Sequence, residues 1–340
     1  MTALPFIENS EVFFGLVGPV GVDLKLVSKC LEVELTRLNY RTVVVRLSDL
    51  LFSTIFRPQQ KFDSEFDRLD QLMTAGDQLR ANSKQTDALA MLAVYALHEA
   101  RRAITGDSRI TGDALKQPER IAYIFHSLKH PGEASLLRNL YGRLFNLVSV
   151  YAPRHERLDA LAQRLAQSET NSDPKRFRAH AEQLIERDMQ AGNEFGQNVQ
   201  DTFPLADFFL RLSSEDSMRE HIRRYIEILF GYQFHTPTRD EHGMFNAKAA
   251  ALRSADLSRQ VGAILASHQG DILGSGCNEV PMAGGGIVWC DDEVNDHRDL
   301  RLGYDTNAKK KGEILGEILN ELKRAGWLAR AKSRMDTKSL

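Results

Sequence analysis

Hydrophobic positions near the start of the chain change from a short apolar run to a helical stripe and back again. Residues 12–14 are apolar and lead into a glycine-rich stretch at 15–21. Apolar side chains then recur at helical spacing over 24–38, and β-branched residues dominate 43–47. Short apolar runs of this kind are typical of buried parallel strands. The pattern predicts a strand, a helix and a second strand, which together form a βαβ unit.

The same alternation continues further along the chain. Two helices are predicted within 64–104. The remaining strands are predicted at 121–125, 144–151 and 205–210, and the remaining helices at 131–142, 153–167 and 174–190. Strands that alternate with helices indicate a mostly parallel sheet with helices on both faces. The predicted fold class is therefore α/β.

A polar stretch with a proline at 235–240 indicates a change of domain. A helix is predicted before it, over 213–230, and a helix, a hairpin and an amphipathic helix are predicted after it. These later elements are expected at 244–257, 259–267, 272–276 and 308–326. The resulting division is a first domain over 1–212, a linker helix and loop over 213–242, and a second domain over 243–340.

Composition excludes several classes of protein. The 340 residues are 42% hydrophobic and 26% charged, which is typical of a folded domain and excludes collagen-like and disordered chains. The formal net charge of -2 gives no signal for nucleic acid as a partner. The sequence shows neither a long apolar span nor a basic and apolar leader, so we expect no membrane partner and a cytoplasmic location.

The glycine-rich stretch between the first strand and helix has the layout of a phosphate-binding turn. Such a turn presents backbone N–H groups and the positive end of a helix dipole to an anion. The P-loop signature requires Lys and then Ser or Thr after its last glycine. Here Val22 and Asp23 stand in those places. The predicted nucleotide-binding residues are Gly15, Gly18, Gly21, Asp23, Lys25 and Arg187. The alternative is a tight turn in which Asp23 caps the helix.

Later segments of the first domain resemble P-loop nucleotide kinases. The stretches 184–188, 196–199 and 206–209 resemble the closing part of that domain, and the arginine-rich segment 154–164 resembles its lid. Arginines in a lid bind phosphates through bidentate hydrogen bonds. The alternative for Arg154, Arg157 and Arg164 is a solvated helix face.

The second domain carries a different resemblance. The sequence at 253–265, followed by 270–281, resembles the opening of the cytidine and deoxycytidylate deaminase fold. In that family a helix precedes a strand reading V-G-A-x-I, a hairpin turn, and a strand ending in G-x-N-x-x-P. The resemblance implies that Asn278 binds substrate, together with Arg259 and Glu279. The alternative is a hairpin in which Asn278 caps a turn.

The two domains together resemble the bacterial anti-phage dCTP/dCMP deaminases. Further matches lie at 46–48, 127–131, 284–286 and 296–299. The resemblance implies that 243–340 is the first part of an α/β/α deaminase domain, which lacks the zinc-binding part. It implies deoxycytidine nucleotides as partners and, for the family, zinc-dependent hydrolytic deamination that depletes dCTP. It also implies a nucleotide in the first domain.

The metal chemistry of that family is not supported by this sequence. Zinc deaminases use an H-x-E helix followed by a P-C-x-x-C helix. The three cysteines, Cys30, Cys277 and Cys290, form no close pair, and no P-C-x-x-C occurs. We therefore predict no metal ligand, no assigned catalytic residue and no deaminase activity for this chain alone. Two alternatives remain open, a non-catalytic nucleotide sensor or regulator and a P-loop nucleotide kinase. The apolar stripe at 314–322 is expected to pack as a core helix, and the alternative is that it mediates oligomerisation. An incomplete sheet would expose an edge and apolar surface, so we also expect association into a homo-oligomer.

Overall fold

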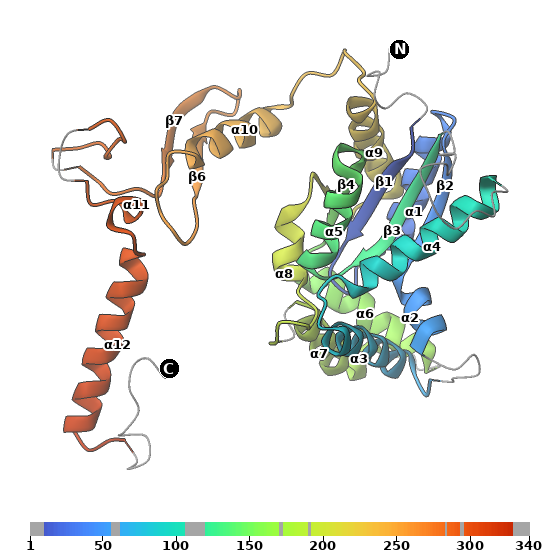
Figure 1. The fold of residues 1–340 in the computed structure, drawn as a ribbon, viewed down its shortest axis with the longest axis horizontal. Helices are drawn as coiled ribbons and strands as arrows, with labels where there is room; N and C mark the ends of the chain where they lie inside the picture. The colour runs from blue at the N-terminus through green and yellow to red at the C-terminus, as the bar shows by residue number, and fades with distance from the viewer. Residues whose placement is uncertain are drawn as a thin grey trace. The chain divides into compact units, whose positions relative to one another are not determined.

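A computed structural model describes residues 10–55, 62–105, 120–169, 173–189, 192–282, 284–292 and 296–328. The chain divides into two units, Met1–His235 and Thr236–Leu340. The first unit contains a five-stranded sheet in the order β2-β3-β1-β4-β5, in which every neighbouring pair is parallel (Figure 1).

The elements of the first unit follow the alternation predicted from the hydrophobic pattern. Its strands are β1 Val12–Val17, β2 Arg41–Arg46, β3 Ile121–Leu128, β4 Phe145–Tyr151 and β5 Phe208–Arg211. Its α-helices are α1 Leu24–Thr36, α2 Leu47–Ile55, α3 Glu65–Ser83, α4 Ala88–Thr105, α5 Pro131–Tyr141, α6 Arg154–Ser168, α7 Arg178–Met189, α8 Val199–Thr202 and α9 Glu215–Leu229. The α/β prediction is confirmed by a five-stranded parallel sheet whose strands alternate with helices.

Helices cover both faces of this sheet. On β1, Phe14 and Leu16 belong to a core that includes Leu31 of α1 and Ile222 of α9. Phe13 belongs to a separate core on the opposite face. Successive side chains of a strand point to opposite faces, so a strand buried on both sides needs a continuous apolar run rather than an alternating one.

Helix α9 is part of this helical layer. Met218, Ile222 and Ile226 recur every four residues and are fully buried, which places one face of α9 against α1 and β5. These residues were expected in a linker at 213–242, whereas their apolar face completes the core of the first unit.

Helix α10 begins earlier than expected, and helix α2 was not expected at all. Helix α10 spans Arg239–Ala251 and begins five residues before the predicted position at 244. Thr238 and Glu241 form a capping box, in which each side chain accepts a backbone N–H at the helix start. Helix α2 follows β2 directly and was not predicted, because its residues continue the apolar run of the strand without a turn signal.

The second unit consists of α10, an antiparallel hairpin and two further helices. The hairpin strands are β6 Gly262–Ala266 and β7 Ile272–Cys277, and the later helices are α11 Asp299–Leu302 and α12 Thr306–Arg324. Only Ala251, Val288 and Asp299 are buried among the residues of this unit that the structure describes. Ile314, Leu315 and Ile318 of α12 are exposed. Association through this stripe stays a prediction.

None of the helices in the described parts of the chain is long and apolar enough to cross a membrane.

Gly15 provides a test of the sheet packing. A Cβ at this position would lie 2.7 Å from Leu128, 2.8 Å from Phe145 and 2.9 Å from Leu147, all in the core. We expect Gly15→Ala to lower the free energy of unfolding by about 2 kcal/mol, because a filled core must shift to accept a methyl group. Gly76→Ala is the control. Its added Cβ meets neighbours at 3.6 Å or more, and alanine favours the helix. Denaturant unfolding that shows equal stability for both variants would contradict this account.

Candidate functional site

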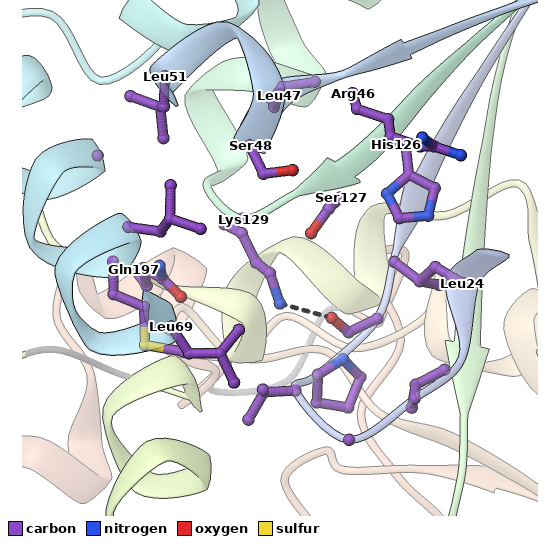
Figure 2. A pocket seen from close by; sticks show the side chains of 18 of the residues that line it. Leu24, Arg46, Leu47, Ser48, Leu51, Leu69, His126, Ser127, Lys129 and Gln197 are labelled. Carbon is purple, nitrogen blue, oxygen red and sulfur yellow. Dashed lines mark hydrogen bonds between the residues drawn. The ribbon is translucent and has the colours of Figure 1, made fainter. Parts of the chain in front are cut away.

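A pocket of about 570 Å³ lies where β1, β2 and β3 end. Its lining includes residues 18–25 after β1, 46–49 at the end of β2, and His126, Ser127 and Lys129 at the end of β3, together with side chains of α3 and α6 (Figure 2). Ligands of parallel α/β sheets bind at the carboxyl ends of the strands, and the volume suits a small molecule. The position and size of this pocket identify it as the candidate site.

Two of the three predicted glycines shape the turn beside the pocket. Gly21 has a φ of +92°, and a Cβ on it would lie 2.7 Å from the carbonyl oxygen of Arg157. The position therefore needs glycine both for its backbone conformation and for the close approach of α6. Gly18 also lines the pocket. Gly15 does not, because it lies within β1 against core side chains.

Asp23 occupies the anion position at the start of α1. Its Oδ1 accepts hydrogen bonds from Lys25 N at 3.0 Å and Leu26 N at 3.1 Å. In a phosphate-binding turn, N–H groups at this place bind the ligand. Here the carboxylate caps the helix and satisfies them.

A buried ion pair holds the other side of the turn. Lys129 Nζ lies 2.8 Å from Asp188 Oδ1 and donates to Gly18 O at 2.8 Å. Asp188 Oδ2 accepts from Val20 N at 2.6 Å, and the Asp188 side chain is fully buried. The turn is thus attached to β3 and α7 through a single carboxylate.

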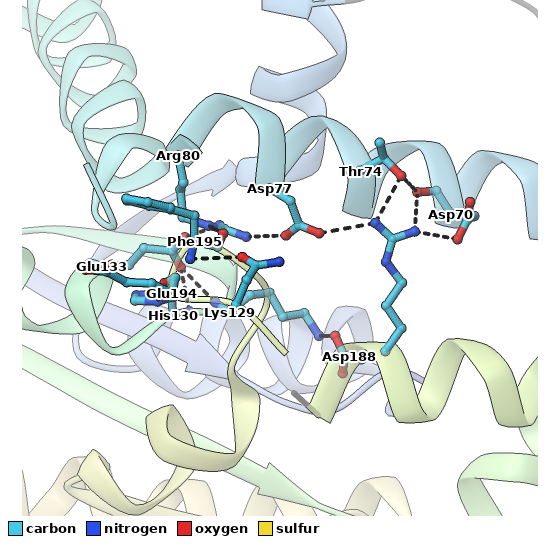
Figure 3. Close-up of polar contacts among 12 residues, drawn as sticks. Asp70, Thr74, Asp77, Arg80, Lys129, His130, Glu133, Asp188, Glu194 and Phe195 are labelled. Atoms are coloured by element: carbon cyan, nitrogen blue, oxygen red, sulfur yellow. Dashed lines mark hydrogen bonds and ion pairs between the residues drawn. The ribbon is translucent and has the colours of Figure 1, made fainter. Parts of the chain in front are cut away.

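Arg187 belongs to a polar network beside the pocket, outside its lining. It donates to Asp70 at 2.6 Å, Thr74 at 3.0 Å and Asp77 at 3.1 Å, all on α3 (Figure 3). Asp77 also accepts from Arg80 at 2.9 Å. The guanidinium of Arg187 therefore joins α7 to α3, and its nucleotide-binding role stays a prediction.

Arg80 continues this network to the segment around residue 195. Its buried guanidinium donates to Glu133 at 3.0 Å and to the carbonyl of Phe195 at 2.8 Å. His130 contacts the carbonyl of Glu194 through Nε2 at 3.1 Å. These contacts fix the segment that brings Gln197 into the pocket (Figure 3).

Basic side chains outnumber acidic ones in the pocket wall. The basic residues are Lys25, Arg46, Arg68, Arg80, Lys129 and Arg164, and the acidic ones are Asp23, Asp49 and Glu133. Glu65, at the start of α3, pairs with both Arg68 and Arg164. Burial acts to raise the pKa of Glu65, but the two arginines outweigh it and the pKa is lowered.

The arginines at 154–164 have three different environments. Arg154 pairs with Glu182 at 2.7 Å on an exposed surface. Arg157 is buried, and its Nε donates to the carbonyl of Ala152 at 3.2 Å. Arg164 alone lines the pocket. The solvated-face alternative describes Arg154, whereas Arg157 is buried, and a lid at 154–164 stays a prediction.

His126 and Ser127 end β3 at the pocket. His126 was not singled out from the sequence, and Ser127 only as part of the stretch 127–131. Burial, with the charges of Arg46 and Lys129, lowers the pKa of His126 to about 4. Ser127 has a φ of +76° and is bulged, since Leu16 pairs with His126 and Val17 with Leu128. A bulge re-aims a side chain, and Figure 2 shows Ser127 among the pocket residues. The only signal in the sequence was that polar residues directly follow a buried strand.

The predicted substrate residues of the second unit meet at the end of the hairpin. Asn278 Oδ1 accepts from Val261 N at 2.7 Å, and its amide donates to the carbonyl of Arg259 at 2.8 Å. Glu279 accepts from Ala255 N at 2.8 Å. Asn278 and Glu279 therefore connect β7 to the chain that follows α10.

The chain contains one H-x-E triplet, His180-Ala181-Glu182, on α7 of the first unit. The ring of His180 packs 4.8 Å from that of Phe66, and Glu182 pairs with Arg154. Within the described ranges, no group of three His, Cys, Asp or Glu side chains is placed to hold a metal ion. Cys30 is buried and Cys290 is exposed. These residues do not fit a deaminase zinc site.

Comparisons with known proteins identify fold-level neighbours only. Neither a scan against protein-family models nor a search of curated proteins finds a match. A solved shikimate kinase from Aquifex aeolicus is similar at 11% identity with a TM-score of 0.33, covering 63% of this chain and 96% of the kinase. A de novo designed protein with a P-loop NTPase fold is similar at 10% identity with a TM-score of 0.23, covering 67% of this chain and 99% of the design. The α/β class of this chain rests on the strand order and the helical layers of the structure itself.

His126 gives a prediction about pH. Its pKa falls from 6.5 to about 4 on folding, so between these values the unfolded chain binds a proton that the folded chain does not. Stability must then fall as the pH is lowered through this window, by about 2 kcal/mol from this group between pH 7.5 and 5. We expect His126→Gln to reduce the loss of unfolding free energy by that amount. An unchanged pH dependence in the variant would contradict a buried, neutral His126.

Proposed function

We propose that the first unit binds a nucleotide in the pocket at the ends of β1, β2 and β3 without transferring a phosphoryl group. The observation that carries this proposal is a wall in which basic residues outnumber acidic ones beside a glycine turn. Phosphorylated ligands are anions, and a concave site lined by one sign of charge concentrates them. Of the alternatives raised by the sequence, this favours the nucleotide sensor or regulator.

The pocket lacks the side chains that P-loop enzymes use for phosphoryl transfer. In P-loop enzymes a lysine holds the phosphates, and a Ser or Thr with an acidic residue holds Mg²⁺. Val22 and Asp23 replace the lysine and the hydroxyl here. Of the three acidic lining residues, Asp23 caps α1, Glu133 pairs with Arg80, and Asp49 lies 3.9 Å from Arg46. The side chains of this pocket therefore do not fit a magnesium nucleotide centre.

Calorimetric titration of the full chain with dCTP, dCMP and ATP tests the proposal. We expect saturable binding of at least one of them, with no transfer of the ATP γ-phosphate to dCMP. Arg154→Gln is the control, because Arg154 lies on the exposed surface and pairs with Glu182. Phosphorylation of dCMP would favour the kinase alternative, and the absence of any nucleotide binding would refute the proposed site.

We propose a second candidate function for the whole protein, which is membership of the deoxycytidine nucleotide deaminases. The supporting observation is the helix and hairpin of the second unit, which bring Arg259, Asn278 and Glu279 together at one end. Zinc would supply the activated water in that reaction. Since the described residues do not fit such a site, no catalytic step is assigned to this chain.

The deaminase proposal predicts an inactive 340-residue chain. We expect no conversion of dCTP or dCMP to the deoxyuridine nucleotides, and much less than one zinc per chain by elemental analysis, because the chain has no P-C-x-x-C. One zinc per chain with turnover of dCTP would overturn this expectation.

A further inference from the structure

The ligand class of the pocket follows from which of its charges are already satisfied. We infer that it binds a nucleoside monophosphate, with the phosphate beside Lys25 and Arg46 and an N–H of the base donating to Gln197. This inference rests on the nucleotide-binding function proposed above and narrows it to one phosphate.

Four of the basic lining residues are committed to protein acceptors. Arg80 pairs with Glu133, and Lys129 pairs with Asp188. Arg68 and Arg164 share Glu65. These four charges are balanced inside the protein, so a ligand must displace an ion pair to use any of them.

Lys25 and Arg46 are the two cations without a close acidic partner. Among the described residues, no hydrogen bond or ion pair joins the Lys25 ammonium to an acidic group. Arg46 reaches Asp49 only at 3.9 Å, with both side chains substantially exposed. A pair of this kind contributes little. Two uncompensated positive charges match one phosphate monoester, which carries a charge of about -1.5 to -2 at neutral pH.

The second and third phosphates of a longer ligand would lie near carboxylates instead of free backbone N–H donors. Asp23 accepts the N–H groups at the start of α1, and Asp188 accepts Val20 N within the glycine turn. These are the groups over which a P-loop spreads the phosphates of a triphosphate. Additional phosphates would therefore be repelled where they usually gain hydrogen bonds.

The opposite wall of the pocket suits a base. Leu69, Leu72 and Met73 of α3, with Leu51 and Leu89, contribute apolar surface to the pocket lining. Gln197 is only 7% exposed, and its buried Oε1 has no hydrogen-bond partner in the described part of the chain. Figure 2 shows its amide among the pocket side chains. Because a buried unpaired oxygen is costly, a ligand N–H at this place gains affinity.

The experiment is a set of calorimetric titrations of the full chain with AMP, CMP, GMP and UMP. The comparison ligands are the matching triphosphate, the matching nucleoside and ribose 5-phosphate. We expect at least one monophosphate to bind tenfold or more tightly than its nucleoside and than ribose 5-phosphate, and no more weakly than its triphosphate.

Three variants locate the two ends of the ligand. Arg46→Gln and Lys25→Gln should each weaken binding of the monophosphate at least fivefold and leave the affinity for the nucleoside unchanged. Gln197→Met should weaken binding of the monophosphate at least threefold and leave the affinity for ribose 5-phosphate unchanged. Arg154→Gln is the matched control and should leave the affinities for the monophosphate and for ribose 5-phosphate unchanged. Thermal unfolding of each variant verifies that it is folded.

The outcomes separate this inference from the function on which it rests. A triphosphate that binds more than tenfold more tightly than its monophosphate overturns the inference and leaves nucleotide binding intact. Monophosphate affinity unaffected by Arg46→Gln and Lys25→Gln also overturns it. No binding of any nucleotide refutes the proposed function itself.

Discussion

The ion pair between Lys129 and Asp188 is the contact on which the candidate site depends. It joins the end of β3 to α7, and the same two side chains hold Gly18 O and Val20 N of the turn after β1. Asp188 is fully buried, so removing either partner would leave a desolvated charge. The pair therefore sets the shape of the turn and, with it, one wall of the pocket.

The same contact changes what a phosphate-binding turn can do. Strand, glycine turn and helix are all present, yet carboxylates of Asp23 and Asp188 occupy N–H groups that such a turn offers to a ligand. Free positive charge lies instead at Lys25 and Arg46, beside the ends of β1 and β2. A glycine turn after a parallel strand can thus have its backbone N–H groups satisfied by carboxylates of the protein itself.

The two units differ in how far their apolar surface is covered. The first unit has cores on both faces of its sheet, whereas the second has three buried residues among those described. Its hairpin exposes Leu265 and Leu273, and its last helix exposes Ile314 and Ile318. Burying exposed apolar patches of this kind against another surface would stabilise the unit.

Periodicity in the sequence was sufficient to predict the α/β class, the strands of the first unit and most of its helices, because burial on both faces of a sheet imposes apolar runs that no tertiary detail obscures. The glycine turn and the helix cap at Asp23 were also predictable, since both are local. Tertiary structure decided the side-chain contacts and the burial that form the candidate site. Pairing of Lys129 with Asp188, the unpaired oxygen of Gln197 and the buried position of His126 depend on segments far apart in the chain. Charge balance in a pocket is a property of these distant contacts, so the sequence alone could not show which cations remain available to a ligand.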